Sequence, residues 1–514
     1  MPFKITPEID FSAVGLITDI PTHSLPDGAW NDCLNLRCKD GSVQGVNTFA
    51  DNIILHDTDA VISGGTAMAV TQFTPAGYNY LILAFIVKGT DGFGHVVTYN
   101  TSTSAYDDIT NSIASLQFTF DDKYPPQIFV FNEMLIVNPA NDAPPMFTDA
   151  GISSGSLTQL PNWLTDSTTA PLVTRSLKPF GNRLIAMNIL EERGAAVDAN
   201  LPVDILWSSH ITGIGSLTAV EWAASTTNTA GDAFAIQTPG KILDGGQLGE
   251  FFIAYKTDSV IRVAETGDTY VLSFESIFED DGLYSSRCFA NIGDAQHLVV
   301  GNYGVYIHDG QSQKTDIAKG IFQDTIFDLV KPDERDRAFC FQQTRDKEVW
   351  FCFSSTTNTA SGCNLAFVYD YNEKKLHKRS LPGLSDIFET ELDGELAIYA
   401  AKPSDTKLQL LSNTTYEADG FFVHEDDNIA DNTSIKWING IYLDSVNDVK
   451  VALTATQHLT DTKVYTFQTF TPATAHKLDV RTTGRYMNIK VQMSGSANPQ
   501  LGKLQFDIKQ AGKR

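Results

Sequence analysis

Long apolar runs, a secretion signal and cysteine pairs are all missing from this sequence. No stretch approaches the roughly 18 to 20 apolar residues that cross a bilayer, and the start Met-Pro-Phe-Lys-Ile-Thr has no apolar signal core. We therefore expect no membrane-spanning segment and a chain made, and at first kept, in a cytoplasm. The six cysteines form no Cys-x-x-Cys pair, which argues against a disulfide framework or a redox motif. Cys352, between two phenylalanines, is expected to be a buried free thiol.

Charged residues are also scarce, and most of them are acidic. They make up 19% of the chain, below the usual quarter, whereas 42% apolar and 11% aromatic residues are typical of a folded protein. The formal net charge of −25 excludes a broad phosphate-gripping surface, and with it a conventional DNA-binding protein. An acidic surface either keeps a protein dispersed or lines a passage through which DNA slides without sticking. Charge alone leaves both interpretations open.

Motifs of known catalytic and metal sites are absent as well. The sequence has no Ser-x-Asp-x-Gly-x-x-Trp box of sialidase propellers, no Gly-x-Ser-x-Gly, no His-Glu-x-x-His, no phosphate loop and no EF-hand loop. His297 and His308 bracket one predicted hairpin without a third ligand, which favours a core or surface role over metal binding. The acidic runs flank predicted turns and are typical of solvated loops, and they are Asp107-Asp108, Asp121-Asp122, Glu191-Glu192, Glu279-Asp280-Asp281 and Asp333-Glu334. The sequence nominates no catalytic residue, metal ligand or cofactor.

What the sequence does contain is a recurring pair of short apolar strands separated by a polar turn. Seven first members of these pairs align on Leu81, Leu135, Leu184, Phe252, Leu298, Val349 and Leu396. Their spacing is about 46 to 54 residues, with one interval near 68 that should hold an insertion, and this matches the period of propeller blades. Second strands follow at 95–99, 205–208, 260–263, 305–308, 366–369 and 408–411. Each pair predicts a hairpin.

These repeats predict an all-β fold built around a β-propeller of six or seven blades over residues 61–415. A single blade cannot bury both of its faces, and closing a ring of blades hides the exposed edges. A row of β-sandwich domains would also give short strands at regular spacing and remains the alternative.

The two ends of the chain break the repeat. Residues 1–60 place turn signals between short apolar pieces and predict an extended arm with one hairpin. Residues 416–514 predict a separate, small β-sandwich-like domain that follows an acidic turn at Glu425-Asp426-Asp427. Its predicted strands are 435–443, 449–454, 463–470, 477–480, 486–493 and 503–509, many of which alternate apolar with polar residues.

Three separated segments of the sequence resemble a known family. The first runs from Gly15-Leu16 through Asp19-Ile20-Pro21 and Leu25-Pro26-Asp27-Gly28-Ala29-Trp30 to Asn35-Leu36-Arg37 and Asp40-Gly41. The second joins Gly282-Leu283-Tyr284-Ser285 to 301–310, and the third runs from Gly484-Arg485-Tyr486 to Ala511-Gly512-Lys513-Arg514. In their order and spacing they resemble the tail nozzle proteins of podoviruses, also called tail accessory or packaged-DNA stabilisation proteins.

The resemblance implies a structural protein of the virion tail, assembled in the host cytoplasm, that is not an enzyme. Such a protein forms a homohexameric ring below the portal and the adaptor, or head-to-tail connector, and meets tail fibre or spike proteins. It retains packaged DNA and later passes double-stranded DNA through its lumen without sequence-specific binding. Six copies would carry about −150 formal charges, and a wall of that sign repels phosphates.

Candidate assembly contacts lie in the two ends of the chain. They are Trp30 and Arg37 in the arm and Trp437, Arg485 and Tyr486 in the C-terminal domain. Core packing is the alternative role for each aromatic residue among them. Two rival functions also remain, a propeller-type glycan-cleaving tail enzyme, which needs two carboxylates facing each other across a sugar, and a host-binding tail fibre protein.

Overall fold

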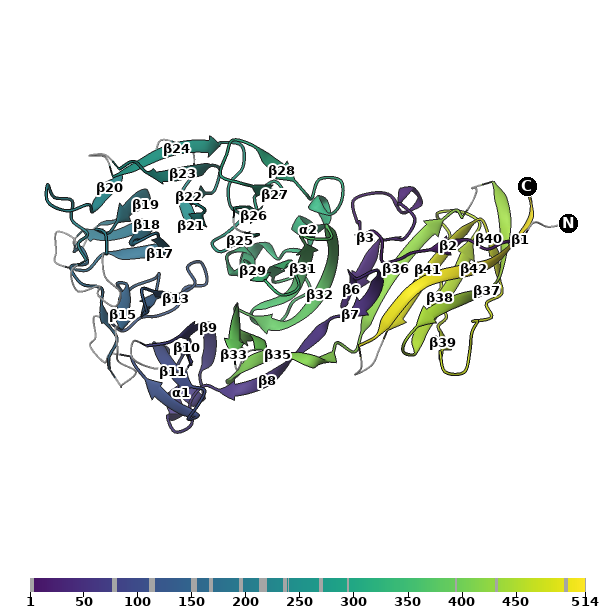
Figure 1. Ribbon diagram of the computed structural model, residues 1–514, viewed down its shortest axis with the longest axis horizontal. Coiled ribbons are helices and arrows are strands. Elements are labelled where there is room, and N and C mark those ends of the chain that lie inside the picture. Colours follow the sequence, from purple (N-terminus) through teal and green to yellow (C-terminus); the bar gives the residue numbers. More distant parts are fainter. Residues whose placement is uncertain are drawn as a thin grey trace.

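The seven aligned apolar segments are the second strands of seven four-stranded antiparallel sheets, which form the blades of a β-propeller (Figure 1). The computed structural model describes residues 4–75, 81–110, 116–148, 155–165, 170–193, 197–211, 220–233, 238, 240–267, 271–293, 295–392, 395–429, 433–493 and 498–513. The expected all-β propeller is confirmed, and the number of blades is seven.

The first four blades follow one another along the chain, each running from its innermost to its outermost strand. Blade 1 comprises β9 (Thr66–Phe73), β10 (Ile82–Lys88), β11 (Gly94–Asn100) and β12 (Ala105–Asp108). Blade 2 comprises β13 (Gln127–Phe131), β14 (Met134–Asn138), β15 (Met146–Thr148) and β16 (Thr158–Gln159). Blade 3 comprises β17 (Val173–Phe180), β18 (Arg183–Arg193), β19 (Val197–Trp207) and β20 (Gly231–Ala233). Blade 4 comprises β21 (Ile242–Leu248), β22 (Phe251–Lys256), β23 (Val260–Glu265) and β24 (Leu272–Phe278).

The long interval near 68 residues falls in blade 3. There β18 and β19 are each 11 residues long and form a hairpin, and a connection of more than 20 residues leads from β19 to β20. Trp222 of this connection is buried and meets Trp163 of blade 2 edge to face, with ring centroids 4.6 Å apart. The extra residues therefore seal the contact between two neighbouring blades.

The last blade is closed by a strand from the beginning of the chain. Blade 5 comprises β25 (Phe289–Asn291), β26 (His297–Val300), β27 (Val305–His308) and β28 (Lys314–Asp316), and blade 6 comprises β29 (Phe339–Gln343), β30 (Glu348–Phe353), β31 (Cys363–Asp370) and β32 (Lys375–Leu384). Blade 7 comprises β33 (Asp386–Leu392), β34 (Glu395–Ala401), β35 (Lys407–Tyr416) and, outermost, β8 (Asn47–Ile54). Pairing of β8 with β35 ties the two ends of the ring together and leaves no open gap between first and last blade.

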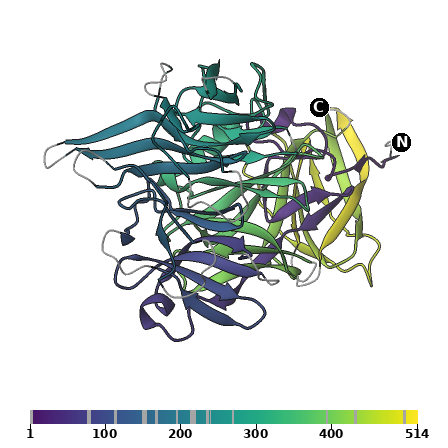
Figure 2. The ribbon, with the colours of Figure 1, turned by 60° about the vertical axis from the view of Figure 1, so that its left-hand side comes forward.

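A β-sandwich of two sheets lies beside the propeller and carries both chain termini (Figures 1 and 2). One sheet has the order β40 (Thr482–Gly484), β37 (Ser434–Ser445), β42 (Gln500–Lys513), β7 (Ser42–Gly45) and β6 (Leu36–Lys39), with β1 (Lys4–Ile5) and β2 (Glu8–Ile9) also pairing with β42. The other has the order β39 (Gln468–Phe470), β38 (Val449–Thr456), β41 (Tyr486–Met493), β36 (Gly420–Asp427) and β5 (Asp32–Leu34). A short parallel pair, β3 (Gly15–Leu16) and β4 (Ala29–Trp30), completes the strands.

Residues 4–60 therefore differ from the extended arm that the sequence predicts. The expected hairpin exists as β6 and β7, with Asp40 and Gly41 in its turn at positive φ, but both strands belong to the sandwich sheets. The stretch that continues as β8 belongs to the propeller instead. Three predictions within 416–514 also differ. The acidic turn lies within and at the end of β36, only 468–470 of the strand expected at 463–470 pairs, and 477–480 contributes a single bridge between Leu478 and Ile441.

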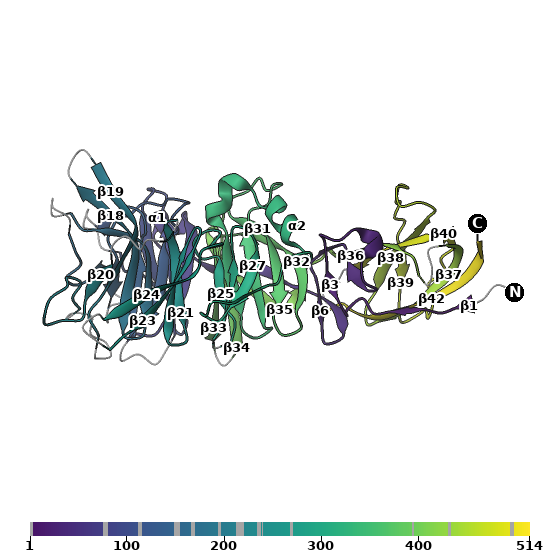
Figure 3. The same cartoon turned by 90° about the horizontal axis from the view of Figure 1, so that it is seen from above.

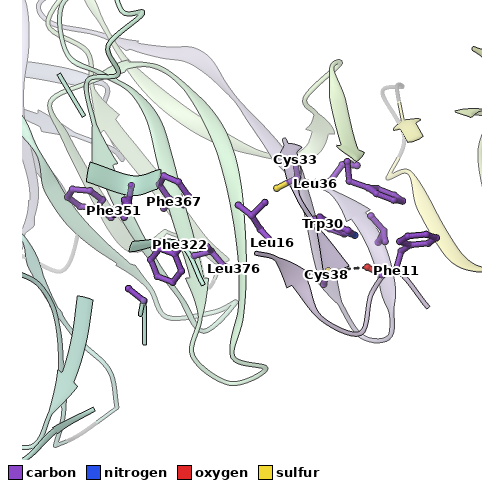
Figure 4. Close-up of a cluster of buried hydrophobic side chains, with 14 of the residues drawn as sticks. Phe11, Leu16, Trp30, Cys33, Leu36, Cys38, Phe322, Phe351, Phe367 and Leu376 are labelled. Carbon is purple, nitrogen blue, oxygen red and sulfur yellow. Dashed lines mark hydrogen bonds between the residues drawn. The ribbon is translucent and has the colours of Figure 1, made fainter. Parts of the chain in front are cut away.

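A single hydrophobic core runs from inside the sandwich through the first segment of the chain into blades 4, 5 and 6, and Figure 4 shows part of it. Phe11, Leu16 and Trp30 lie between apolar residues of the sandwich, such as Phe422, and those of the propeller, such as Leu376. We call this region the joint. Because its apolar surface is removed from water, separating the two units would expose it again.

Among the residues that the structure describes, helical structure is limited to short connections. The helices are α1 (Ala60–Ser63), α2 (Gln323–Leu329) and the 3-10 segments Thr22–Ser24 and Pro332–Arg337. Within the described part of the chain, none of the helices has the length and apolar character needed to span a membrane.

Candidate functional site

Trp30, a candidate assembly contact, lies inside the joint. It is fully buried and its ring stacks on Phe422 with centroids 5.1 Å apart and planes inclined by 14°. The backbone of Trp30 and Asn31 also forms hydrogen bonds within the joint. Ile17 N–H donates to the carbonyl of Trp30, and Asn31 N–H donates to the carbonyl of Val423. Core packing, the alternative role for this aromatic, is what the structure shows.

The turn before Trp30 explains a glycine in the first resembling segment. Gly28 has φ +81°, and a Cβ at this position would lie 2.3 Å from the carbonyl oxygen of Asp10. Only glycine accepts both the left-handed backbone and the close approach. The turn Pro26-Asp27-Gly28 is thereby fixed, and it directs Trp30 into the core.

Arg37 is likewise engaged within its own chain. From β6 of the sandwich it forms ion pairs with Asp346 at 2.8 Å and Glu348 at 3.2 Å, both in blade 6. Lys39 also pairs with Asp346. Burial favours the neutral form of Asp346, but the two cations outweigh it and lower its pKa to about 2. The cluster fastens the sandwich to the propeller.

The joint contains a second polar connection, between the first segment and β32. Asn35 has φ +57° and exchanges hydrogen bonds with Ser380, whose N–H donates to Asn35 Oδ1 at 2.7 Å. Asn35 N–H donates to the carbonyl of Lys378, whose Nζ lies 2.6 Å from Asp32. Hydrogen bonds that satisfy buried polar groups on both sides fix the two units in one relative orientation.

The three C-terminal candidates occupy different environments. Trp437 in β37 is 48% exposed, the largest aromatic surface among the five candidates. Arg485 and Tyr486 are half-buried at the corner where the chain passes from β40 to β41. There Arg485 N–H donates to Thr456 and its carbonyl accepts from Lys436 Nζ at 2.9 Å. Trp437 alone among the five presents a large apolar surface to solvent.

A cavity of about 740 Å³ opens at one mouth of the propeller axis. It is lined by turns before inner strands and by outer turns of blades 1, 2, 5, 6 and 7, with Lys88, Asp121, Asp122, Arg287 and Arg337 as its charged residues. Asp122 pairs with Arg337 at 2.6 Å. The cavity thus brings opposite charges together, and its two aspartates do not face each other as an isolated carboxylate pair.

Charged side chains at and beside this cavity connect inner strands of different blades. Arg287 has φ +63°, and its guanidinium forms an ion pair with the carboxylate of Asp386 in blade 7 at 3.3 Å. The backbone N–H of Arg287 donates to the carboxylate of Asp244 in blade 4 at 3.0 Å. Asp244 also accepts from Ser176 Oγ at 2.6 Å and lies 3.3 Å from Lys178. These bonds link the inner strands of blades 3, 4, 5 and 7 near the axis.

The acidic run at 279–281 has structural partners. Asp281 is buried and accepts from the N–H groups of Gly282 and Asn302, both at 2.9 Å, which fixes the turn before β27. Burial raises its pKa, and the backbone hydrogen bonds partly oppose this. Asp280 is exposed and pairs with Lys314 at 2.8 Å. Replacing Asp281 would therefore disturb the fold, so a loss of function in such a variant would not identify Asp281 as catalytic.

His297 and His308 lie in the core between blades 4 and 5, bound to Tyr255. The ring nitrogens His297 Nδ1 and His308 Nε2 each lie 2.7 Å from Tyr255 Oη. Gly310 N–H donates to His308 Nδ1, and His297 Nε2 is 3.1 Å from the carbonyl of Gln247. One pattern satisfies all four bonds: His308 Nε2–H donates to Tyr255, which donates to His297 Nδ1. Both imidazoles are then neutral. Burial lowers the pKa of His297 to about 4 and that of His308 to about 3.

Replacing Tyr255 with phenylalanine is expected to lower the free energy of unfolding by about 1 to 3 kcal/mol, because two buried ring nitrogens lose their partner. In the wild type this free energy should also fall as the pH drops from about 6.5 toward 4. Unfolded histidines bind protons in that window, whereas the folded ones, with lowered pKa, do not. Urea unfolding at pH 7.5 and pH 5 measures both effects, with exposed Tyr303→Phe as control. Equal stability of the two variants would contradict this role.

Metal-ligating groups do not gather in the part of the chain that the structure describes: no set of three or more His, Cys, Asp or Glu side chains is placed to hold an ion. All six cysteines are free, and Cys352 is fully buried. The sequence had not indicated the axial network of Arg287 or the joint cluster of Arg37. A lone Asp or Arg beside a strand carries no local signal of a partner 100 or 300 residues away.

The fold defines a seven-bladed β-propeller with a β-sandwich built from both ends of the chain. No family model and no curated protein matches the sequence. Among solved structures, it is similar to the WD40 domain of Pan2 from Neurospora crassa, at 8% identity and a TM-score of 0.38, over 72% of this chain and 95% of that one. It is also similar to a puromycin-hydrolysing peptidase of Mycobacterium tuberculosis, at 8% identity and a TM-score of 0.38, over 75% and 62% of the two chains. An exo-β-1,3-galactanase of Phanerochaete chrysosporium follows, at 9% identity, a TM-score of 0.23, and coverage of 97% and 100%.

Proposed function

We propose that this chain is a structural virion protein, the tail nozzle of a short-tailed bacteriophage. In this proposal six copies form a ring below the portal and adaptor, retain packaged DNA and pass it during ejection. Partners are other copies of the chain, the adaptor, and tail fibre or spike proteins.

The observation that carries the proposal is where the resembling segments lie. The first segment supplies β3 to β6, and the third supplies β41 and β42, so segments from opposite ends of the chain build the sandwich and the joint together. The second segment lies in the connection from blade 4 to blade 5 and in blade 5 itself, and its Tyr284 packs against the shared core. Arg514, the last residue of the third segment, lies outside the described residues. The resemblance thus rests on residues that hold one architecture together.

Charge supports the same proposal. Residues 47–416 contain 45 Asp and Glu against 23 Lys and Arg, so the propeller segment carries −22 of the −25 formal charges. Propellers arranged around a common lumen would present a negative wall, and phosphates would pass it without binding tightly. The passage would be the space between subunits, because ion pairs near the axis of each propeller join its own inner strands to one another.

The copy number in virus particles tests the proposal. Particles of the virus whose genome encodes this chain would be purified, and its peptides quantified against portal peptides by mass spectrometry with isotope-labelled standards. We expect about one copy per two portal subunits, the ratio of a sixfold to a twelvefold ring. Capsid peptides provide the internal control. Absence of the protein from particles would refute the nozzle and favour a glycan-cleaving enzyme or another soluble binding protein. A ratio that corresponds to three copies, or a multiple of trimers, per tail would favour a fibre.

A further inference from the structure

The two units of the molecule differ sharply in charge. Residues 417–514 contain 11 Lys and Arg and 11 Asp and Glu, and residues 1–46 add 3 basic and 6 acidic residues. The sandwich segments therefore carry only −3, against −22 for the propeller segment. Two propellers brought side by side repel each other, whereas a sandwich brought against a propeller experiences much weaker repulsion.

One face of the sandwich combines an exposed aromatic ring with basic residues. Trp437 in β37 pairs directly with Lys509 in β42 and with Thr483 in β40, so all three side chains share the outer face of the sheet. Arg481 lies two positions before Thr483 and is exposed, as Lys509 is. Within the described residues, no ion pair engages Arg481 or Lys509. We call Trp437, Lys509, Arg481 and Thr483 the sandwich face.

An acidic surface with exposed apolar side chains lies on the propeller, at blade 5 and α2. Tyr303, in the turn between β26 and β27, is 66% exposed, and Ile321, before α2, is 36% exposed. Exposed Asp316, Asp324 and Asp328 accompany them, and the exposed Lys319 lies between the first two in the sequence. We call Tyr303, Ile321, Asp316 and Asp324 the propeller face.

The backbone of the propeller face is held in place before any partner arrives. Gln323 Nε2 donates to the carbonyl of Tyr303 at 2.6 Å, which links the turn to the start of α2. Asp316 accepts from the N–H groups of Ala318 and Lys319, and Asp324 N–H donates to Asp19 at 3.0 Å. A surface ordered in advance loses little conformational entropy on binding.

We propose that the sandwich face of one copy binds the propeller face of a second copy. Trp437 would pack against Tyr303 and Ile321, while Lys509 and Arg481 would meet Asp316 and Asp324. This identifies the subunit contact of the ring and so rests on the proposed function above. Because the two faces differ, the contact is heterologous, and repeating it closes a ring or builds a filament.

Within one chain, the sandwich face and the propeller face lie apart, so they do not bind each other. Figure 3 shows α2 rising from the propeller beside the joint, whereas β37 lies toward the far end of the sandwich, near the termini. Charge complementarity also favours this contact, because the contact places Lys509 and Arg481 of the sandwich face against the acidic propeller.

Charge reversal on the full-length protein tests the contact. Association would be followed by native mass spectrometry and light scattering over a range of concentrations and salt. We expect Trp437→Ala and Tyr303→Ala each to weaken association at least tenfold, and Lys509→Glu and Asp324→Lys to do so singly. The double variant Lys509→Glu/Asp324→Lys should recover most of the loss, because it restores opposite charges at the same place. Phe93→Ala, at a similarly exposed aromatic residue in blade 1, is the matched control. All of these side chains are exposed, so melting temperatures should remain unchanged.

The outcomes separate this inference from the nozzle proposal. A wild type that stays monomeric at every concentration, or single variants that associate like the wild type, would overturn the contact. If virus particles contain the ring and still incorporate Trp437→Ala at full copy number, the contact is wrong while the nozzle stands. If the contact forms in solution but particles lack the protein, the nozzle is wrong and the contact stands.

Discussion

Replacing Trp30 with alanine is expected to lower the free energy of unfolding by about 3 to 5 kcal/mol, the usual cost of deleting a large buried aromatic side chain. Trp30 is fully buried, stacks on Phe422 and belongs to the core shared by sandwich and propeller. The cavity would open inside the joint, where neighbouring strands are held by hydrogen bonds on both sides and relax only partly. The shared core should therefore lose its continuity.

Differential scanning calorimetry measures this effect, because it also reports whether the two units unfold together. The wild type should show one main transition, and Trp30→Ala should show a lower first transition that separates from the second. Trp437→Ala is the matched control, since it removes the same side chain from a position that is 48% exposed. Its expected effect on monomer stability is below about 1 kcal/mol. Equal melting temperatures for the two variants would show that the joint does not depend on Trp30.

Replacing Arg37 with methionine is expected to cost about 3 to 5 kcal/mol, because it leaves a buried carboxylate without its partner. Glu348, 5% exposed, accepts from Arg37 at 3.2 Å and from Trp350 Nε1 at 2.9 Å. Burial raises the pKa of Glu348, and the positive charge of Arg37 opposes that rise. Without the guanidinium, the carboxylate must either stay charged in a dry site or bind a proton.

A second substitution shows whether the stranded carboxylate is the cause. Glu348→Gln in the Arg37→Met background keeps an acceptor for Trp350 and removes the negative charge, so it should recover part of the lost stability. Arg345→Met, at an exposed neighbouring arginine, is the control and should change stability by no more than about 0.5 kcal/mol. Chemical denaturation at pH 7 compares the four proteins. A loss for Arg37→Met no larger than for Arg345→Met would mean that the ion pair does not fasten the two units.

The repeat in the sequence predicted the propeller because blade strands are local structures. Each of the seven aligned segments is the second strand of a blade. The partner strand that each predicted hairpin requires is the next strand in the chain. The alternation of apolar and polar residues, the turn residues and the strand spacing all involve residues close together in the sequence. They can therefore be recognised without information on distant contacts. The exact number of blades was not accessible in this way, because the last blade borrows β8 from residues 47–54.

The candidate contacts show where reasoning from sequence stopped. Trp30 and Trp437 are both tryptophans at strand ends or within strands, yet one is fully buried and the other 48% exposed. Arg37 was a plausible surface contact until its partners, more than 300 residues away, were placed beside it. Burial and pairing depend on which distant strand covers a side chain, and a single sequence holds no direct record of that.

The sequence by itself determined the all-β class, the blade period, the strong negative charge and the hairpins, since each of these follows from composition or from residues close in the chain. The tertiary structure decided that strands between residues 4 and 46 belong to the C-terminal sandwich, that β8 closes the seventh blade, and that one core joins the two units. These features come from pairings between opposite ends of the chain. Their stability arises from apolar surface buried only when the whole molecule has folded, and local propensities do not specify which ends will meet.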